Sequence, residues 1–295
     1  MPILNNSAQQ TLVDDRFQGE APQWSHIYEQ PGLIPDIYRL RRDLTIAAIQ
    51  RLAFPGARVL EIGCGAGLVS VTLAKQGYQV TATDRLDAMI RLTRDRAESV
   101  GVCDCITTRK CDVYELPFPP ESFDVVVAVG VLPWLDFPEK ALLEIVRVLS
   151  HSGRVIVTTD NKWSLTTLFD PLCSPLTRPA RRLTRMVLQH FKLVARSQKP
   201  VLHLHSTSWI DDLLSWAGLE KSFSTTIGFG PLLFLKHPML PHPLGVRMHA
   251  KLQRLADRRA PFIRSGGIEY LVVARRSISA SDPLHQVVHT SVELA

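Results

Sequence analysis

The sequence predicts an α/β protein with a mostly parallel sheet and helices on both of its faces. Between Arg58 and Thr159, short apolar segments alternate with segments of helical periodicity, and the connections are short. The apolar segments, such as FDVVVAVGV at 123–131, are continuous rather than alternating, which is typical of strands buried on both faces. Strands and helices that alternate in this way form parallel sheets through right-handed crossovers.

The individual elements follow in order along the chain. Apolar residues at helical spacing predict a helix over 35–52, with Pro35 near its start. The alternating part is then expected to contain strands at 57–63, 78–84, 105–113, 123–131 and 153–159, and helices at 68–76, 85–100 and 138–149. After Thr159 the alternation stops, and the expected elements are a basic amphipathic helix at 178–195, a helix at 208–218, and two late strands at 219–230 and 267–277.

The two ends of the chain show no periodicity. Residues 1–20 and 281–295 are therefore predicted to be flexible tails. The chain between them, 21–276, is interpreted as a single domain, as its length allows.

The cysteine pattern and the hydropathy of the chain indicate the cellular compartment of the protein. The five cysteines are irregularly spaced and contain no C-x-x-C pair, so neither a metal site nor a disulfide framework is predicted. The N-terminus lacks a basic region followed by an apolar one, and the apolar runs are too short to span a bilayer. We therefore expect a cytoplasmic protein with no signal peptide and no transmembrane segment.

A glycine-rich loop carries the strongest functional signal. The string VLEIGCGAG places Gly63, Gly65 and Gly67 between a strand and a helix, where glycine lets the backbone approach a ligand closely. A dinucleotide fingerprint would require glycine or alanine at the position that Leu68 occupies. The neighbouring carboxylate of Glu61 suits a cationic amino group better than a pyrophosphate.

Two aspartates follow at the ends of the next strands. Asp84 closes YQVTATD, where a carboxylate can bind both hydroxyls of a ribose, although it could equally cap the next helix. Asp112 ends the third expected strand, where its side chain can meet an adenine amino group, and Val113 can supply a backbone N–H.

These strings resemble the class I S-adenosylmethionine-dependent methyltransferases, especially the type 11 group. VLEIGCGAG resembles the family's first motif, TATD its second, CDVYELPF its adenine-side motif and RVLSHSGRVIV its passage into the fifth strand. The resemblance implies a Rossmann-like sheet of seven strands, mostly parallel, in which the last strand is antiparallel and a lid-like insertion precedes it. It divides the domain into a cofactor core at 36–160 and two substrate-lid segments at 161–207 and 229–266.

The resemblance also implies a role for individual residues. S-adenosylmethionine would be the cofactor, with S-adenosylhomocysteine as the product. The residues expected to bind it are Glu61, Gly63, Cys64, Gly65, Gly67, Asp84, Arg85, Asp112, Val113, Val129 and Gly130, the last two beside the sulfonium. The segment LPWLD has Trp134 near the position where many relatives have histidine, so no histidine base is assigned by analogy.

Catalysis does not require a particular side chain here. Methyl transfer from a sulfonium is accelerated largely by positioning, and a base is needed only if the acceptor loses a proton. The catalytic residue is therefore left open, with His203, His205 and Asn161 as weak candidates. Candidates for the substrate pocket are Trp24, Tyr28, Trp134, Asn161 and Trp163, and no metal is expected.

The charge is concentrated in the last third of the chain. From Arg178 to Arg264 there are fifteen Lys and Arg against four Asp and Glu, which leaves the remainder acidic. Beside the apolar stretch GFGPLLFLKHPMLPHPLGV, this pattern is typical of a packed lid with a solvated basic face, of a pocket for a lipophilic or anionic substrate, or of a membrane surface. Arg181, Arg182 and Arg185 in the basic segment 178–199 are the candidates for contact with anionic lipid at the inner membrane surface. Nucleic acid is disfavoured because the basic residues lack interleaved aromatic ones.

The sequence thus predicts a methyltransferase that acts on a small, lipophilic or anionic metabolite, with oxygen as the favoured acceptor. Three alternatives stay open: a nucleotide-dependent reductase, a cofactor-binding regulatory or scaffold protein without catalysis, and a methyltransferase that acts on RNA.

Overall fold

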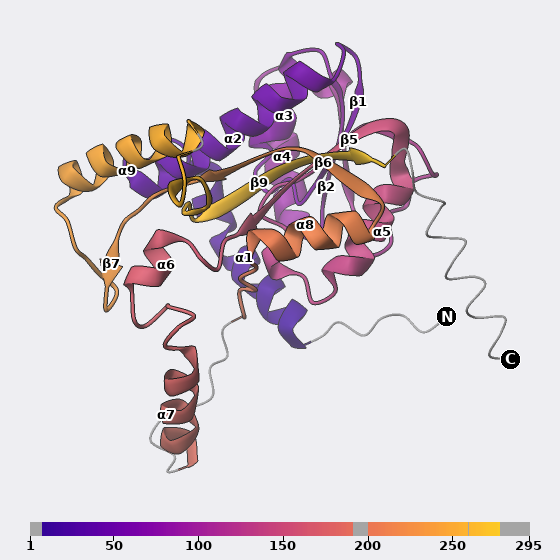
Figure 1. Ribbon diagram of the computed structural model, residues 1–295. Coiled ribbons are helices and arrows are strands. Elements are labelled where there is room, and N and C mark those ends of the chain that lie inside the picture. Colours follow the sequence, from indigo (N-terminus) through magenta and orange to yellow (C-terminus); the bar gives the residue numbers. More distant parts are fainter. Residues whose placement is uncertain (1–7, 191–199, 259, 278–295) are drawn as a thin grey trace, which may run out of the picture.

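A computed structural model describes residues 8–190, 200–258 and 260–277 of the chain (Figure 1). The expected tail at 281–295 and residues 191–199 of the basic segment lie outside the described residues.

The core of the molecule is a seven-stranded sheet with the strand order β3-β2-β1-β4-β5-β9-β6. The first five strands are parallel, and β9 pairs antiparallel with both β5 and β6. The strands are β1 (Arg58–Ile62), β2 (Gln79–Asp84), β3 (Ile106–Lys110), β4 (Phe123–Ala128), β5 (Leu149–Asp160), β6 (Leu219–Ile227) and β9 (Glu269–Arg276). The predicted Rossmann-like fold, with an antiparallel last strand, is confirmed.

Helices cover both faces of this sheet, and apolar side chains fill the space between the layers. Ile37 and Ile49 of α2 and Leu73 of α3 pack on one face, whereas Leu142 of α5 and Ile210 of α8 pack on the other. The helices involved are α2 (Leu33–Leu52), α3 (Leu68–Lys75), α4 (Asp87–Ser99), α5 (Pro138–Val148) and α8 (Thr207–Trp216). Because the central strands are buried on both sides, their sequences are largely apolar.

The N-terminal part of the chain differs from the prediction. Residues 8–20, expected to belong to a flexible tail, form most of a helix, α1 (Ala8–His26). Val13 and Ala21 are buried, and with Phe17 and Trp24 they recur every three or four residues, which forms one apolar stripe. The prediction was wrong because this stripe is narrow and the rest of the helix is polar.

The segments after β5 and after β6 leave the sheet and carry short elements. The first contains α6 (Leu165–Phe169) and the basic helix α7 (Arg178–His190), which projects away from the body of the molecule (Figure 1). The second contains the hairpin of β7 (Leu233–Phe234) and β8 (His237–Pro238), followed by α9 (His242–Asp257). None of the described helices is long and apolar enough to cross a membrane.

Candidate functional site

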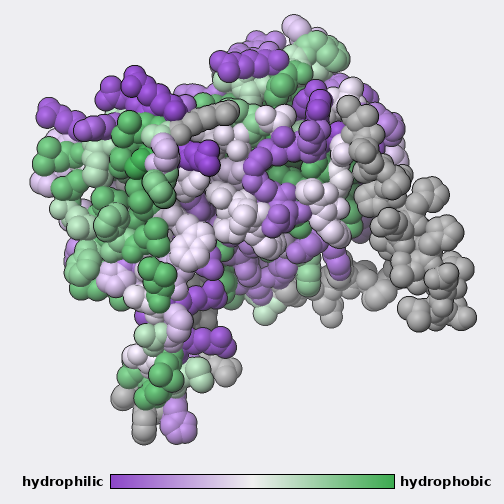
Figure 2. Space-filling view, viewed as in Figure 1, coloured by the Kyte–Doolittle hydropathy of each residue, from purple (hydrophilic) through white to green (hydrophobic). Residues whose placement is uncertain are grey.

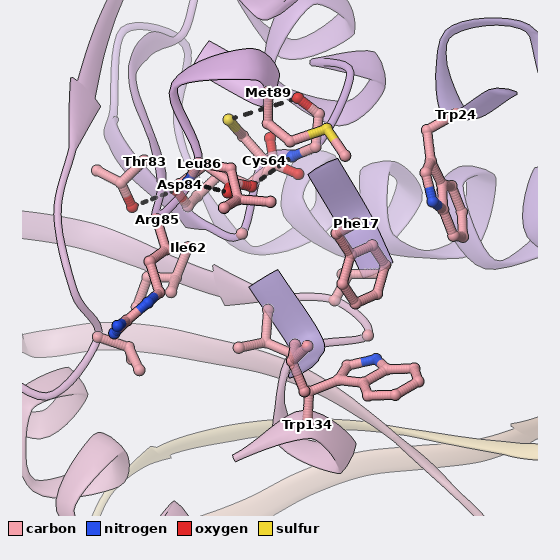
Figure 3. Close-up of a pocket in the computed structure, with 18 of the residues that line it drawn as sticks. Phe17, Trp24, Ile62, Cys64, Thr83, Asp84, Arg85, Leu86, Met89 and Trp134 are labelled. Carbon is pink, nitrogen blue, oxygen red and sulfur yellow. Dashed lines mark hydrogen bonds between the residues drawn. The ribbon is translucent and has the colours of Figure 1, made fainter. Parts of the chain in front are cut away.

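A pocket of about 400 Å³ opens at the carboxyl ends of β1, β2, β4 and β5. This edge is where parallel α/β sheets bind ligands, because the strand order reverses there between β1 and β4. Most of the residues predicted to bind a cofactor line this pocket, some of them shown in Figure 3: Glu61, Gly63, Cys64, Gly65, Asp84, Arg85, Asp112, Val113, Val129 and Gly130.

The three glycines of the loop after β1 have different functions in the structure. All three have positive φ, at 68° for Gly63, 53° for Gly65 and 74° for Gly67. A Cβ on Gly63 would lie 2.6 Å from Val131 Cγ2, and one on Gly67 would lie 2.8 Å from Thr93 Cγ2, so both are required by packing. A Cβ on Gly65 would meet nothing within 4 Å, because this glycine faces the pocket. Gly67, although predicted to contact the cofactor, is the N-cap of α3 and does not line the pocket.

The carboxyl of Glu61 is buried behind the loop. It accepts a hydrogen bond from the Ser70 hydroxyl, and its side chain is almost inaccessible to solvent. Burial raises the pKa of Glu61 to about 8, and the nearby Asp84 acts in the same direction. Near neutral pH this carboxyl is therefore largely protonated, and a cation bound at this end of the pocket would stabilise its ionised form.

Asp84 holds the glycine loop and the start of α4 together. One oxygen accepts from the Gly65 backbone N–H at 3.1 Å and the other from the Leu86 N–H at 2.9 Å. Burial has the largest effect on the pKa of Asp84 and raises it, whereas the hydrogen bonds from the backbone lower it. The N-cap of α4 is Leu86, so Asp84 is not the cap of that helix.

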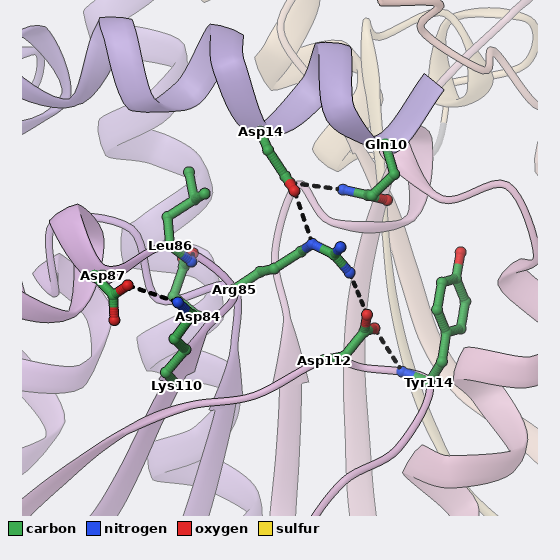
Figure 4. Close-up of polar contacts among 9 residues, drawn as sticks. All are labelled: Gln10, Asp14, Asp84, Arg85, Leu86, Asp87, Lys110, Asp112 and Tyr114. Carbon is green, nitrogen blue, oxygen red and sulfur yellow. Dashed lines mark hydrogen bonds and ion pairs between the residues drawn. The ribbon is translucent and has the colours of Figure 1, made fainter. Parts of the chain in front are cut away.

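Arg85 connects the N-terminal helix to the third strand end (Figure 4). It donates a hydrogen bond of 2.9 Å to Asp14 of α1 and another to Asp112. The Asp112 carboxylate also accepts from the Tyr114 backbone N–H at 3.0 Å, while Gln10 donates to Asp14 at 2.9 Å. Helix α1 is thereby attached over the end of the pocket that Asp112 lines.

Aromatic side chains form the wall opposite the glycine loop. Trp24, Tyr28 and Trp134, all predicted for the substrate pocket, line it together with Phe17 and Tyr38, which the sequence analysis did not identify. The ring of Phe17 packs edge-on against Trp134 at 5.2 Å between centroids and lies 5.9 Å from Trp24. The apolar stripe of α1 was the signal that could have identified Phe17.

Charged residues occupy the end of the pocket beside Gly130. Arg41 of α2 donates to both carboxylate oxygens of Glu269 at 3.1 and 3.2 Å, and its guanidinium lies over the Tyr38 ring. Asp160, at the end of β5, lies directly opposite Glu269 in the sheet. Arg41 and Glu269 are separated by 228 positions, so no local pattern could have paired them, whereas Asp160 is a strand-end aspartate like Asp84.

Besides Gly67, four predicted residues lie outside the lining of this pocket. Asn161 is buried and donates to the backbone carbonyls of Ser265 and Gly267, so its side chain anchors two chain segments. Trp163 is 42% exposed. The ring of His205 stacks on Trp209 at 3.9 Å, and His203 is held by a backbone hydrogen bond to Pro133. None of these four side chains lines the pocket, and their predicted roles toward a substrate stay predictions. In the described ranges, no group of three His, Cys, Asp or Glu side chains is arranged to hold a metal ion.

Comparison with known proteins gives a family for the core. Residues 60–157 match the sequence model of the family described as "Methyltransferase domain". A phosphatidylethanolamine N-methyltransferase of Cereibacter sphaeroides is 36% identical over 102 residues, which are 35% of this chain and 50% of that protein. The ubiquinone/menaquinone biosynthesis C-methyltransferase UbiE of Paraburkholderia phymatum is 35% identical over 139 residues, 46% of this chain and 54% of that protein. The chain thus spans about half the length of the curated relatives it matches.

The solved structures extend the likeness to the whole fold. A magnesium protoporphyrin IX methyltransferase from Synechocystis PCC 6803 superposes with a TM-score of 0.61 at 16% identity, over 91% of this chain and 100% of that one. At this identity the superposition shows a shared fold alone, and the family assignment depends on the sequence match. Residues 60–157 therefore match the methyltransferase-domain family, and the chain around them shares the fold of a solved methyltransferase.

Proposed function

We propose that this chain transfers a methyl group from S-adenosylmethionine to a small apolar molecule, with a hydroxyl oxygen as the favoured acceptor. The observation that carries this proposal is one pocket in which a glycine loop and a strand-end carboxylate face an aromatic wall. The first two features suit the cofactor, and the wall suits an apolar acceptor beside it.

The residues present fit S-adenosylmethionine. The open space at Gly65 would admit a ligand against the backbone, and the paired oxygens of Asp84 suit two vicinal hydroxyls. In this proposal Asp112 and Val113 would contact the adenine, and Val129 and Gly130 would lie beside the sulfur. When bound, S-adenosylmethionine supplies an electrophilic methyl group on a positively charged sulfur.

The aromatic wall would hold the acceptor and exclude water. Trp24, Tyr38 and Trp134 offer large apolar surfaces that bury a ring or an acyl body at little entropic cost, because such side chains have few rotatable bonds. Orientation of the two reactants in a dry pocket supplies much of the acceleration of a displacement reaction.

A regulatory protein that binds the cofactor without turnover would use the same cofactor residues, so only turnover separates the two functions. A methyltransferase acting on RNA is less well supported, because the aromatic residues lie inside the pocket instead of alternating with the surface arginines. The reductase is disfavoured by Leu68, which lines the pocket where a dinucleotide fingerprint requires a small residue.

The first test is binding followed by turnover. Calorimetry should show binding of S-adenosylmethionine and none of NAD. Methyl-labelled S-adenosylmethionine should then be incubated with the protein and the soluble, lipid and RNA fractions of a cell extract. Label in the small-molecule or lipid fraction supports the proposal, label in RNA supports that alternative, and binding without label in any fraction supports the non-catalytic protein.

The surface further suggests a cytoplasmic protein with peripheral contact to an anionic membrane. Helix α7 is amphipathic, with Arg178 and Arg182 exposed on one side and Leu183, Met186 and Val187 exposed on another. Basic helices of this kind bind at the interface of anionic bilayers.

Apolar side chains are also exposed on both insertions. Figure 2 shows them over α6, the β7–β8 hairpin and along α7, and they include Phe169, Leu172, Leu176, Phe234, Leu235 and Met239. Single exposed apolar residues are normal, whereas a concentration on the two inserted segments is typical of an interaction surface. A membrane would also concentrate an apolar acceptor close to the pocket.

A further inference from the structure

The acceptor end of the pocket contains a carboxyl group for which the cofactor has no evident use. Asp160 is the last residue of β5 and lines the pocket. Thr158, two residues earlier and therefore on the same face of the strand, accepts a hydrogen bond from the Gly130 backbone N–H at 2.7 Å. Gly130 is the residue expected beside the reactive sulfur. Asp160 is thus the next side chain along this face, beyond the point where the methyl group would lie.

The polar partners around Asp160 are unevenly distributed. Glu269 lies directly opposite it in the antiparallel pair of β5 and β9, so the two carboxyls share one face of the sheet. The guanidinium of Arg41, which acts on Asp160, donates to both oxygens of Glu269. Among the described residues, none donates a hydrogen bond to the Asp160 carboxyl, so its lone pairs are available to a ligand.

The surroundings of Asp160 favour a proton acceptor that works near neutral pH. Burial raises the pKa of Asp160 to about 7, the negative charge of Glu269 adds to this effect, and Arg41 opposes it. Tyr38 of α2 also faces this cluster, and burial raises the pKa of its hydroxyl. The backbone N–H of His205 donates to the Asp160 carbonyl at 3.2 Å, but the His205 ring stacks on Trp209 instead.

We propose that the Asp160 carboxylate accepts a hydrogen bond from the hydroxyl group of the methyl acceptor and takes its proton during transfer. This inference rests on the proposed function. The hydroxyl oxygen forms the new bond to the methyl carbon, while the carbon–sulfur bond breaks and its electron pair stays on sulfur. The hydroxyl proton passes to Asp160, so the products are a methyl ether, a neutral thioether and a protonated Asp160, which then loses its proton to water.

A hydroxyl group fits this end of the pocket better than an ammonium group. An ammonium acceptor would bring a second positive charge next to the sulfonium, and it would have to lose a proton before it could attack. A neutral hydroxyl avoids both costs and still donates the one hydrogen bond that the Asp160 carboxylate lacks. An anionic acceptor group is disfavoured because Asp160 and Glu269 outnumber Arg41.

The test compares Asp160→Asn with the wild type, with Asp160→Glu, and with Asp212→Asn as a matched control on the exposed side of α8. Methyl-labelled S-adenosylmethionine and an organic-solvent extract of the cells from which the chain comes are the probes. We expect Asp160→Asn to transfer label roughly 10²- to 10³-fold more slowly, while calorimetry finds unchanged affinity for S-adenosylmethionine. Asp160→Glu should restore part of the rate, and Asp212→Asn should behave as the wild type.

Two further measurements distinguish a proton acceptor from a structural residue. They are the pH dependence of the transfer rate and the carbon-13 NMR signal of the carboxyl group. The wild-type rate should rise with pH up to about 7 and then level, and this rise should be absent in Asp160→Asn. In protein with carbon-13-labelled aspartate and bound S-adenosylhomocysteine, one carboxyl signal should titrate near neutral pH and disappear in Asp160→Asn.

Two results would overturn the inference while leaving the proposed function intact. They are a rate of Asp160→Asn within threefold of the control, and titration of the Asp160 carboxyl at an ordinary aspartate pKa. Recovery of the label as a methylated amine would overturn both the inference and the hydroxyl acceptor of the proposed function. If the wild type transfers no label to any component, the proposed function fails, and the role of Asp160 fails with it.

Discussion

At the residue scale, Asp84 connects the cofactor loop to the second strand. Its carboxylate holds the Gly65 N–H in the structure and faces the pocket where ribose hydroxyls are expected. Replacement by alanine removes charge-assisted hydrogen bonds worth about 1.5–3 kcal/mol, so affinity for S-adenosylmethionine should fall roughly ten- to hundredfold in calorimetry. Asp87→Ala is the matched control, because that carboxylate forms only an exposed pair with Lys110. Equal affinities of the two variants would remove Asp84 from the ribose role.

The raised pKa of Asp160 leads to a second prediction, which concerns the stability of the folded protein. Its pKa of about 7 in the folded protein lies above the ordinary value of 3.8, so between these values the folded state keeps a proton that the unfolded state has lost. Stability therefore falls as pH rises from about 4 to 7, by an amount on the order of 4 kcal/mol from this group. The variant Asp160→Asn has no carboxyl at this position, so it should not lose this part of the stability as pH rises.

Denaturant unfolding at pH 5 and pH 8 checks this prediction. The free energy of unfolding of Asp160→Asn, relative to that of the wild type, should be higher at pH 8 than at pH 5. For Asp212→Asn the difference from the wild type should be the same at both pH values. A pH-independent difference for Asp160→Asn would show that the carboxyl has an ordinary pKa in the folded state.

The site residues that sequence could identify are those that adjoin a local motif. Glu61, Gly65 and Asp84 lie at strand ends next to glycines or helices, and each lines the pocket. Arg41 and Glu269 could not be identified, because only the strand order and the docking of α2 bring them together. Asn161 shows the opposite case, because its position after a strand end is visible in the sequence whereas its hydrogen bonds to the backbone of a distant segment are not.

At the element scale, α1 closes the pocket that the sheet leaves open. It contributes Phe17 and Trp24 to the aromatic wall, and Gln9 exchanges two hydrogen bonds with the backbone of Val201, at 2.7 and 3.0 Å. Sequence predicted the elements of the sheet and its helices well, because their apolar patterns are strong. It missed α1 because most of the helix surface is polar.

Phe17→Ala should therefore weaken retention of the bound cofactor. Loss of the ring contacts with Trp24 and Trp134 costs about 1 kcal/mol, which corresponds to a roughly fivefold faster release of S-adenosylhomocysteine. Stopped-flow tryptophan fluorescence measures the release. Gln18→Ala, on the exposed side of the same helix, is the matched control and should release the ligand at the wild-type rate. Equal rates for both variants would mean that α1 does not restrain the cofactor.

At the scale of the whole molecule, charge and hydropathy separate the core from its insertions. Within the described part of the chain, most of the basic residues between Arg178 and Arg264 lie on α7 and α9 or next to them, whereas the cofactor end of the pocket is rich in carboxylates. The sequence could predict this division because charge is additive along the chain. It could not show which arginines are free to meet a partner, since that depends on contacts between neighbouring turns.

Arg181 illustrates this point and determines the design of the membrane test. Its guanidinium donates to the backbone carbonyls of Leu172 and Ser174, so reversing its charge would disturb the turn that holds α7. Arg178 and Arg182 are exposed and carry no such contact among the described residues. They are the positions at which the charge of α7 can be changed without removing its attachment.

Arg178→Glu/Arg182→Glu should bind anionic vesicles less tightly than the wild type. Each arginine near such a surface contributes about 1 kcal/mol, so removal of two lowers the binding constant at least roughly thirtyfold, and the new negative charges lower it further. Sedimentation with vesicles of phosphatidylserine and phosphatidylcholine at low salt measures this, and the effect should shrink as salt is added. Arg51→Glu/Arg91→Glu, with the same change of net charge on α2 and α4, should sediment as the wild type. If the wild type stays in solution with every vesicle, α7 has no role at an anionic membrane; if both double variants lose binding equally, net charge and not α7 accounts for it.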